Sequence, residues 1–225
     1  MTFGRFRRRG AGGGTPVLIA TLAGQLALLV HVALLPPTVV PIEPLALAAA
    51  GVVEPSDGSP PGSLARDEVH PDGARLQISF ETNHAAWVSV LWFEGDRVVS
   101  LYPSVAGGET GEIAADTTYV VPSASTYLRL TPTGADGDWL AVVASSRPDP
   151  RILAVLADPS PSAVVALRDQ LMREARARTS ADGATERFLP TADGRAVAVP
   201  WEQVRGRGRL VLGRRVRVAG MRRPS

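Results

Sequence analysis

The stretch AAWVSVLWFEGDRVVSLYP, residues 85–103, decides the fold of this chain. It opens with a nearly continuous apolar run, turns at Glu94-Gly95-Asp96, and then returns through a second apolar run that ends at Tyr102. Two such runs joined by a short glycine-containing loop predict a β-hairpin. Pro103 lacks the backbone N–H that a sheet ladder needs, so we expect the second strand to end there.

Further short segments between residues 75 and 147 have the character of strands. Leu76–Phe80 alternates apolar and polar side chains, as a half-buried strand does. Three more segments are separated by turns: Thr117–Val121, Thr126–Thr131 and Trp139–Ala144. Six short strands at this spacing predict a compact antiparallel β-sandwich or a barrel-like module.

The remaining residues, 149–225, are expected to form one helix and a basic β tail. Ser160 or Ser162 can cap a helix that runs to about Arg178, with Pro161 tolerated in its first turn. Its apolar positions recur at three- and four-residue steps, and we expect this face to dock on the sheet. These positions are Val164, Leu167, Leu171 and Ala175.

Two strands are expected near the C-terminus, at Arg195–Val199 and Arg209–Val218, with a hairpin-type turn at Asp193-Gly194 before the first. The predicted fold class is therefore mainly β with one C-terminal helix (α+β). In the second strand the apolar residues alternate in a way that predicts arginines along one face.

Residues 76–148 resemble the bacterial DUF4384 family. The resemblance rests on an ordered set of segments: residues 86–92, then LYPS at 101–104 (similar to the family's LFPN), 113–116 with 121–122, and 132–134 ahead of 140–145. Asp116 stands where the family often has glycine. The resemblance implies an envelope-associated β module with a binding role, and it brings no established catalytic residues.

Residues 16–35 form a twenty-residue run without a formal charge. At about 1.5 Å of rise per residue it is long enough to cross a bilayer core as a single transmembrane helix. Four arginines and no acid precede it in residues 1–15, which predicts a cytoplasmic basic leader and an extracytoplasmic remainder. The expected partner of this run is the lipid bilayer of the cytoplasmic (inner) membrane.

Residues 36–74, rich in Pro, Gly, Ser and Asp, are expected to form an extended tether without a core. The apolar stretch Leu45–Val53 within them is too short to span a membrane. A cleaved secretory signal is the alternative to an anchor, because Ala48-Ala49-Ala50 supplies small residues of the cleavable kind. The long apolar core favours the uncleaved anchor, whereas cleavage would leave a periplasmic or secreted protein.

Composition excludes several kinds of chemistry. The chain has no Cys, so disulfides, thiolate metal sites and cysteine nucleophiles are excluded. It also has no Lys, which excludes a lysine-containing phosphate-binding loop and Schiff-base catalysis. All 24 basic residues are arginines.

Charge is segregated along the chain. Residues 16–202 carry a net −10, whereas residues 203–225 contain eight arginines and no acid. This tail is consistent with a solvated edge strand whose charge prevents edge pairing. The more specific hypothesis is a contact for an acidic surface, either envelope phosphates or the acidic middle of the same chain. With the predicted topology it never meets the cytoplasm, so we expect no nucleic-acid partner. The candidate contact residues are Arg205, Arg207, Arg209, Arg214, Arg215 and Arg217.

Other motifs favour ordinary structural roles. Asp136-Gly137-Asp138 resembles the start of a calcium loop but lacks the remaining ligands, which favours a turn. His70 and His84 have no second ligand at a zinc-site spacing, and His70 is expected to be solvated in the tether. Ser104 and Ser123 lie in no nucleophile-elbow motif. We therefore expect no catalytic, cofactor or metal site.

Three classes of function remain. The favoured one is a membrane-anchored, extracytoplasmic binding module of the bacterial envelope that is not an enzyme and has an envelope protein as partner. The second is a secreted or anchored hydrolase, which would need a pocket with convergent titratable groups. The third is a transmembrane signalling regulator that acts through a short cytoplasmic peptide, because about fifteen residues are too few to fold.

Overall fold

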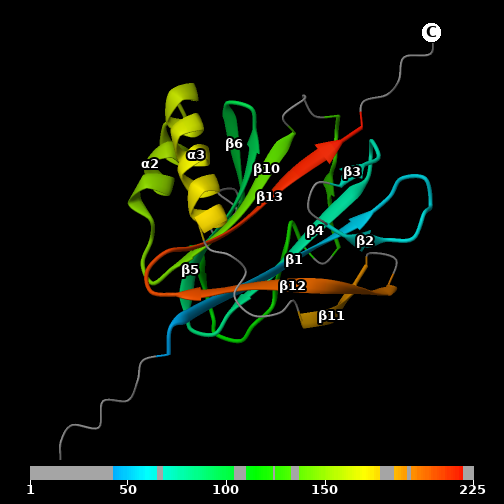
Figure 1. The fold of residues 1–225 in the computed structure, drawn as a ribbon, viewed down its shortest axis with the longest axis horizontal. Helices are drawn as coiled ribbons and strands as arrows, with labels where there is room; N and C mark the ends of the chain where they lie inside the picture. The colour runs from blue at the N-terminus through cyan, green and yellow to red at the C-terminus, as the bar shows by residue number, and fades with distance from the viewer. Residues whose placement is uncertain are drawn as a thin grey trace, which may run out of the picture. The chain divides into compact units, whose positions relative to one another are not determined.

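Among the residues that the structure describes, two β-sheets and two helices form the fold (Figure 1). The computed structural model describes residues 43–64, 68–103, 110–123, 125–132, 137–177, 185–191 and 194–219. Residues from Pro44 onward belong to one compact unit. The predicted leader and membrane span lie outside the described residues. Within the described ranges, none of the helices is both long and apolar enough to cross a bilayer.

The first sheet is antiparallel and has five strands along its main path. Their order is β11 (Thr185–Pro190), β12 (Ala196–Gly206), β1 (Leu45–Glu54), β4 (Arg75–Thr82) and β8 (Tyr119–Val121). Two short strands pair off this path: β2 (Gly62–Ser63) with β1, and β9 (Leu128–Arg129) with β4.

The second sheet contains the predicted hairpin. Its order is β3 (Val69–His70), β13 (Leu210–Val218), β10 (Asp138–Ser145), β5 (Ala86–Glu94) and β6 (Arg97–Tyr102), with β7 (Glu112–Ile113) paired to β5. The β3–β13 pair is parallel and the other pairs are antiparallel. The hairpin of β5 and β6 confirms the prediction made from residues 85–103, and Gly95 in its turn has a φ of 60°.

The main core lies between the two sheets. Side chains of both sheets meet in one buried cluster that includes Leu47, Phe80, Val90, Leu140 and Val216. This arrangement is mainly β and is compatible with the predicted sandwich. The inner faces of the two sheets therefore supply the side chains of this core.

A second core lies between the second sheet and the helices α2 (Pro150–Ala157) and α3 (Pro161–Ala177). Val164, Leu167 and Leu171 of α3 are buried against this sheet, which confirms the predicted docking of the helix. Figure 1 shows both helices on the same side of β5, β10 and β13. Strand β10 is consequently buried on both faces, so it reads as a continuous apolar run.

The prediction of a single C-terminal helix was wrong, because α2 precedes α3. The Asp149 side chain caps α2 by accepting hydrogen bonds from the backbone amides of Arg151 and Ile152, at 2.9 and 3.2 Å. Pro150 follows in the first turn, where its missing N–H costs nothing. An Asp-Pro pair ahead of an apolar segment is therefore the sequence signal that could have identified this helix.

The prediction of a coreless tether at 36–74 was wrong from residue 45 onward. Residues 45–54 form β1, which pairs with β12 on one side and with β4 on the other. Leu47 points into the main core, while Ala48 and Val52 join Trp201 in a third cluster on the outer face. A strand buried on both faces shows no alternation, and the prolines around it concealed it further.

The predicted boundary between residues 148 and 149 is likewise absent, since the unit from Pro44 onward is not divided there. Strand β12 lies in the first sheet and β13 in the second, so the chain crosses from one sheet to the other between Gly206 and Leu210. The Arg-Gly segment at 205–209 provides this crossing, and Gly208 adopts a φ of 82° within it. Residues 203–218 of the basic tail are thus an integral part of both sheets.

Candidate ligand-binding cavity

The first sheet forks beside β1. The ladder between β1 and β12 ends at Ala49 and Glu202. Pro200, two residues before Glu202, has no N–H with which to continue the ladder. Beyond the fork β1 pairs instead with β2, at Val52 and Ser63, while β12 continues beside β11.

A cavity of about 240 Å³ opens at this fork and reaches the space between the two sheets. Its walls come from β1, β2, β4 and β12 of the first sheet and from β10 and β13 of the second. Most of the lining is apolar: Ala49, Ala50, Gly51, Leu64, Ile78, Leu140, Val142, Pro200 and Leu212. An apolar cavity with a few convergent polar groups is the most common form of a small-molecule site.

Gly51 shapes one wall of the cavity. A Cβ atom on Gly51 would lie 2.7 Å from Cβ of Leu64, so a larger residue would push Leu64 away from β1. The backbone N–H of Leu64 donates a hydrogen bond of 2.8 Å to the carbonyl oxygen of Gly51. The absence of a side chain at Gly51 therefore lets Leu64 close the wall.

Three polar residues complete the lining: Ser63, Glu202 and Arg214. Glu202 and Arg214 form an ion pair that joins β12 to β13. Their side chains are 25% and 15% exposed to solvent, respectively. The pair lies on the inner side of each strand, because Val204 and Val216, two positions away, are buried in the main core. The cavity thus has an apolar body and one end where donors and acceptors lie together.

The six candidate arginines do not share one surface. Arg205 and Arg207 are exposed, on β12 and in the crossing segment. Along β13, Arg215 and Arg217 point to one face of the sheet and Arg214 points to the other. The prediction that the arginines share one face was therefore wrong for Arg214.

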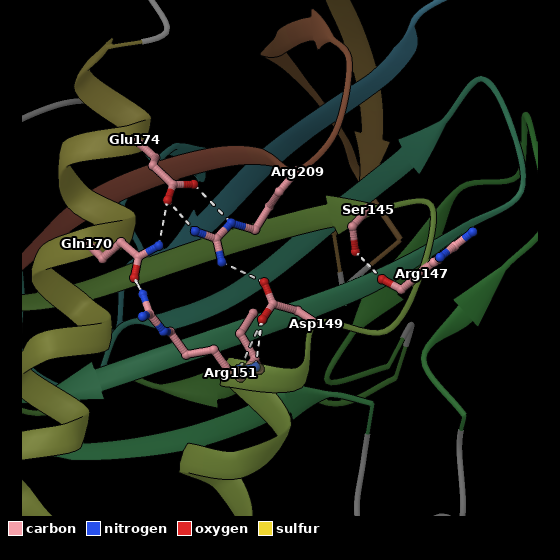
Figure 2. Close-up of polar contacts among 8 residues, drawn as sticks. Ser145, Arg147, Asp149, Arg151, Gln170, Glu174 and Arg209 are labelled. Atoms are coloured by element: carbon pink, nitrogen blue, oxygen red, sulfur yellow. Dashed lines mark hydrogen bonds and ion pairs between the residues drawn. The ribbon is translucent and has the colours of Figure 1, made fainter.

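Arg209 is held in a second ionic cluster, away from the cavity, that connects α2, α3 and β13 (Figure 2). Its Nη1 donates to Oδ2 of Asp149 at 2.6 Å, and its Nε donates to Oε2 of Glu174 at 2.9 Å. Gln170 donates from Nε2 to the same Glu174 and accepts from Arg151. Both acids belong to the acidic middle of the chain, so this arginine makes an internal contact.

The environment of this cluster stabilises both charges. Burial is the largest single influence on the pKa of Asp149, and by itself it would raise the pKa. The hydrogen bond from Arg209 and those from the backbone amides of Ile152 and Arg151 outweigh burial, so the pKa lies below its ordinary value. The pKa of Arg209 is raised, because its bonds to Glu174 and Asp149 outweigh the opposite effect of burial.

The two histidines in the described part of the chain, His70 and His84, lie outside the cavity lining. His84 is exposed in the turn between β4 and β5. His70 is buried in β3, so the prediction that it is solvated in a tether was wrong. Burial lowers its pKa, and its Nε2 has no hydrogen-bond partner within the part of the chain that the structure describes. This histidine is neutral in the fold at neutral pH.

In the calcium-like motif at 136–138, Asp138 begins a strand, and Asp136 lies outside the described residues. Asp138 begins β10, one register step from the pair formed by Trp139 and Phe93, and it therefore faces Glu94 of β5. Burial is the main cause that raises its pKa to about 6, the charge of Glu94 raises it further, and a hydrogen bond from Trp92 partly opposes both. No group of three potential metal ligands occurs within the described ranges.

Replacing Asp138 by Asn should stabilise the protein at neutral pH, because it removes a charge that the folded state disfavours. The expected gain is only about 1 kcal/mol, because the carboxyl keeps part of its contact with water. Its raised pKa means that the folded state binds the proton more tightly, so wild-type stability falls as pH rises from 3.8 to about 6. The gain in the variant should therefore appear across that interval and stay constant above it. Urea unfolding between about pH 4 and pH 8 measures this, with exposed Asp96→Asn as control; parallel curves for wild type and Asp138→Asn would contradict it.

Sequence analysis did not identify the Glu202–Arg214 pair as the polar end of a cavity. The available signal was Arg214 itself, which occupies the register of Leu210, Leu212, Val216 and Val218 on the inner side of β13. A charged residue at a core position of a strand requires a buried partner. The identity of that partner depends on the pairing of the strands, which the sequence does not state.

Comparison with known proteins returned no matching family model, no matching curated protein and no matching solved structure. The resemblance of residues 76–148 to the DUF4384 family stays a prediction.

Proposed function

We propose that this protein is a membrane-anchored, extracytoplasmic binding module of the bacterial envelope, built as a β-sandwich, that holds a small ligand between its two sheets. The observation that carries the proposal is the cavity at the fork of the first sheet. It combines apolar walls with a single ion pair, which is the composition of a binding pocket. A hydrolase needs an activated nucleophile beside a base; this lining has one serine, Ser63, and its carboxylate, Glu202, is paired with Arg214.

The position of β1 supports an uncleaved anchor. Ala48-Ala49-Ala50, the small residues suited to signal cleavage, lie inside β1, where all three pair with β4 and the first two also pair with β12. Cleavage there would remove the first half of a strand that builds the core. Residues 36–44 alone would separate the membrane span from β1, and a chain of that length reaches about 30 Å at most.

The topology can be tested with reporters fused behind Ser225 in the full chain. A reporter active only outside the cytoplasm should be active, whereas one active only in the cytoplasm should be silent. The protein should also remain in the membrane fraction after washing at high salt, because the anchor is apolar. Activity of the cytoplasmic reporter alone would overturn the proposed topology.

Binding can be tested on the full chain purified from membranes. We expect a small molecule to be extracted from the wild-type protein with organic solvent and identified by mass spectrometry. Ala49→Leu, which places added side-chain volume inside the cavity, should purify without it. Val99→Phe adds volume at an exposed position of β6 and serves as the control. Equal amounts of the same molecules from all three proteins would contradict a ligand site in this cavity.

A further inference from the structure

The size of the cavity limits what it can hold. An apolar cavity of about 150 Å³ in another protein accommodates benzene, and one water molecule occupies about 30 Å³ in the liquid. A methylene group is of similar size to a water molecule. A cavity of about 240 Å³ therefore accommodates roughly eight groups of this size.

The walls favour an aliphatic chain over a polar or branched molecule. The wall from the first sheet consists of small side chains of β1 beside Ile78 of β4, and branched side chains of β10 and β13 in the second sheet form the opposite wall. Over the apolar part of the lining a ligand would therefore meet mainly methyl and methylene groups. Each methylene transferred into such surroundings should tighten binding about fourfold.

The ion pair determines the head group. Glu202 offers carboxylate oxygens and Arg214 offers guanidinium N–H donors, side by side at one end of the cavity. Nη1 of Arg214 also donates a hydrogen bond to the carbonyl oxygen of Gly213, at 3.2 Å. A guanidinium has five donors and a carboxylate about four acceptor sites, so the pair can bind a third polar group in addition to these contacts. The two charges cancel, which disfavours a ligand with a net charge, since either sign would repel one partner.

We propose that the cavity binds a neutral single-chain amphiphile of about eight carbons, whose terminal hydroxyl donates a hydrogen bond to Glu202 and accepts one from Arg214. This inference rests on the proposed function, because it names the class of ligand for the same cavity. The aliphatic chain lies between the sheets, against Leu140, Val142 and Leu212.

A series of primary alcohols tests the proposal on the full chain held in lipid nanodiscs. Equilibrium dialysis fixes the free concentration of alcohol, and empty nanodiscs correct for uptake by lipid. The dissociation constant should fall about fourfold for each methylene from 1-butanol to 1-octanol and then level off as the cavity fills. Octanoate and octylamine should bind at least tenfold more weakly than 1-octanol. A charged ligand that binds more tightly than the alcohol would overturn the assignment of the head group.

Variants separate the two ends of the site. Leu212→Phe, which adds volume at the cavity wall, should abolish binding of 1-octanol, and exposed Val99→Phe should leave it unchanged. Wild type should prefer 1-octanol to methyl octyl ether, which cannot donate a hydrogen bond, by about tenfold. The double variant Glu202→Leu and Arg214→Leu should lose this preference while remaining folded, because apolar replacement of a whole buried ion pair is often tolerated.

The outcomes distinguish this proposal from the function on which it rests. If Ala49→Leu removes an extractable molecule of another chemical class, and no alcohol binds, the neutral amphiphile is wrong and the binding module stands. If no alcohol binds and nothing is extracted, both fail. Binding of all alcohols with the same affinity, or binding that survives Leu212→Phe, would place the alcohol outside the cavity and would also overturn the proposal.

Discussion

Replacing Arg209 by methionine should lower the free energy of unfolding by about 3 kcal/mol. The variant leaves the carboxylates of Asp149 and Glu174 near each other without the cation that now bridges them. The side chains of Asp149 and Glu174 are 13% and 29% exposed to solvent, respectively. Because of this partial exposure, the expected loss of stability is at the lower end of the range for breaking a buried ion pair. Methionine keeps most of the aliphatic stem, so the change reports on charge more than on volume. Urea unfolding followed by tryptophan fluorescence measures the difference.

Arg207→Met is the matched control, because Arg207 is exposed two residues earlier in the same crossing segment. It should change stability by less than about 0.5 kcal/mol. The two variants losing equal stability would contradict an ionic role for Arg209.

The loss at Arg209 should depend on pH in a defined direction. The pKa of Asp149 lies below its ordinary value of 3.8, so its stabilising contribution is present above that pH and is lost as the pH falls through the folded pKa. The gap between wild type and Arg209→Met should therefore be constant at neutral pH and shrink below about pH 4. A gap that widens in acid would show that the interaction is not ionic.

Gly213→Ala should lower the free energy of unfolding by about 2–3 kcal/mol. A Cβ atom at Gly213 would lie 2.2 Å from Cζ2 of Trp139 and 3.0 Å from two other atoms of its ring. That ring is 7% exposed and packs against Phe93 at 5.9 Å between centroids, so it has little room to move. The new methyl group must therefore displace either the indole or the backbone of β13.

Gly62→Ala provides the control, because a Cβ atom there would meet nothing within 4 Å and the residue does not have a positive φ. It should change stability by less than about 0.5 kcal/mol. The double variant Gly213→Ala and Trp139→Leu should be less destabilised than the sum of its single changes, because the smaller side chain makes room for the methyl group. Strict additivity would show that the clash is not the cause.

The sequence allowed much of the second sheet to be predicted. The hairpin of β5 and β6, the strand β10 and the apolar face of α3 each depend on local patterns that persist in the structure. The apolar positions of α3 recur with the helical period, whereas β5 and β10 are apolar runs that turn residues bound. Local pattern was sufficient where an element had one apolar face or where clear turns marked the ends of an apolar run.

The rest could not be predicted, because it depends on pairing between distant segments. Strand β1 is covered on both faces, so it lost the alternation that identifies a strand and resembled a spacer between prolines. The very short strands β2, β3 and β7 are defined by their neighbours in space and carry almost no signal of their own. The cavity exists only because β12 separates from β1 at Glu202, which no local pattern records.

The pairing of β1 with β12 also sets the order in which the molecule can fold. Leu45 lies opposite Gly206, so the earliest strand of the unit completes its ladder only when one of the latest has been made. Contacts between residues so far apart in sequence slow folding, and until they form β1 exposes an unpaired edge. If export threads the chain through the membrane from its amino terminus, β1 can therefore complete its ladder only after β12 has emerged on the far side.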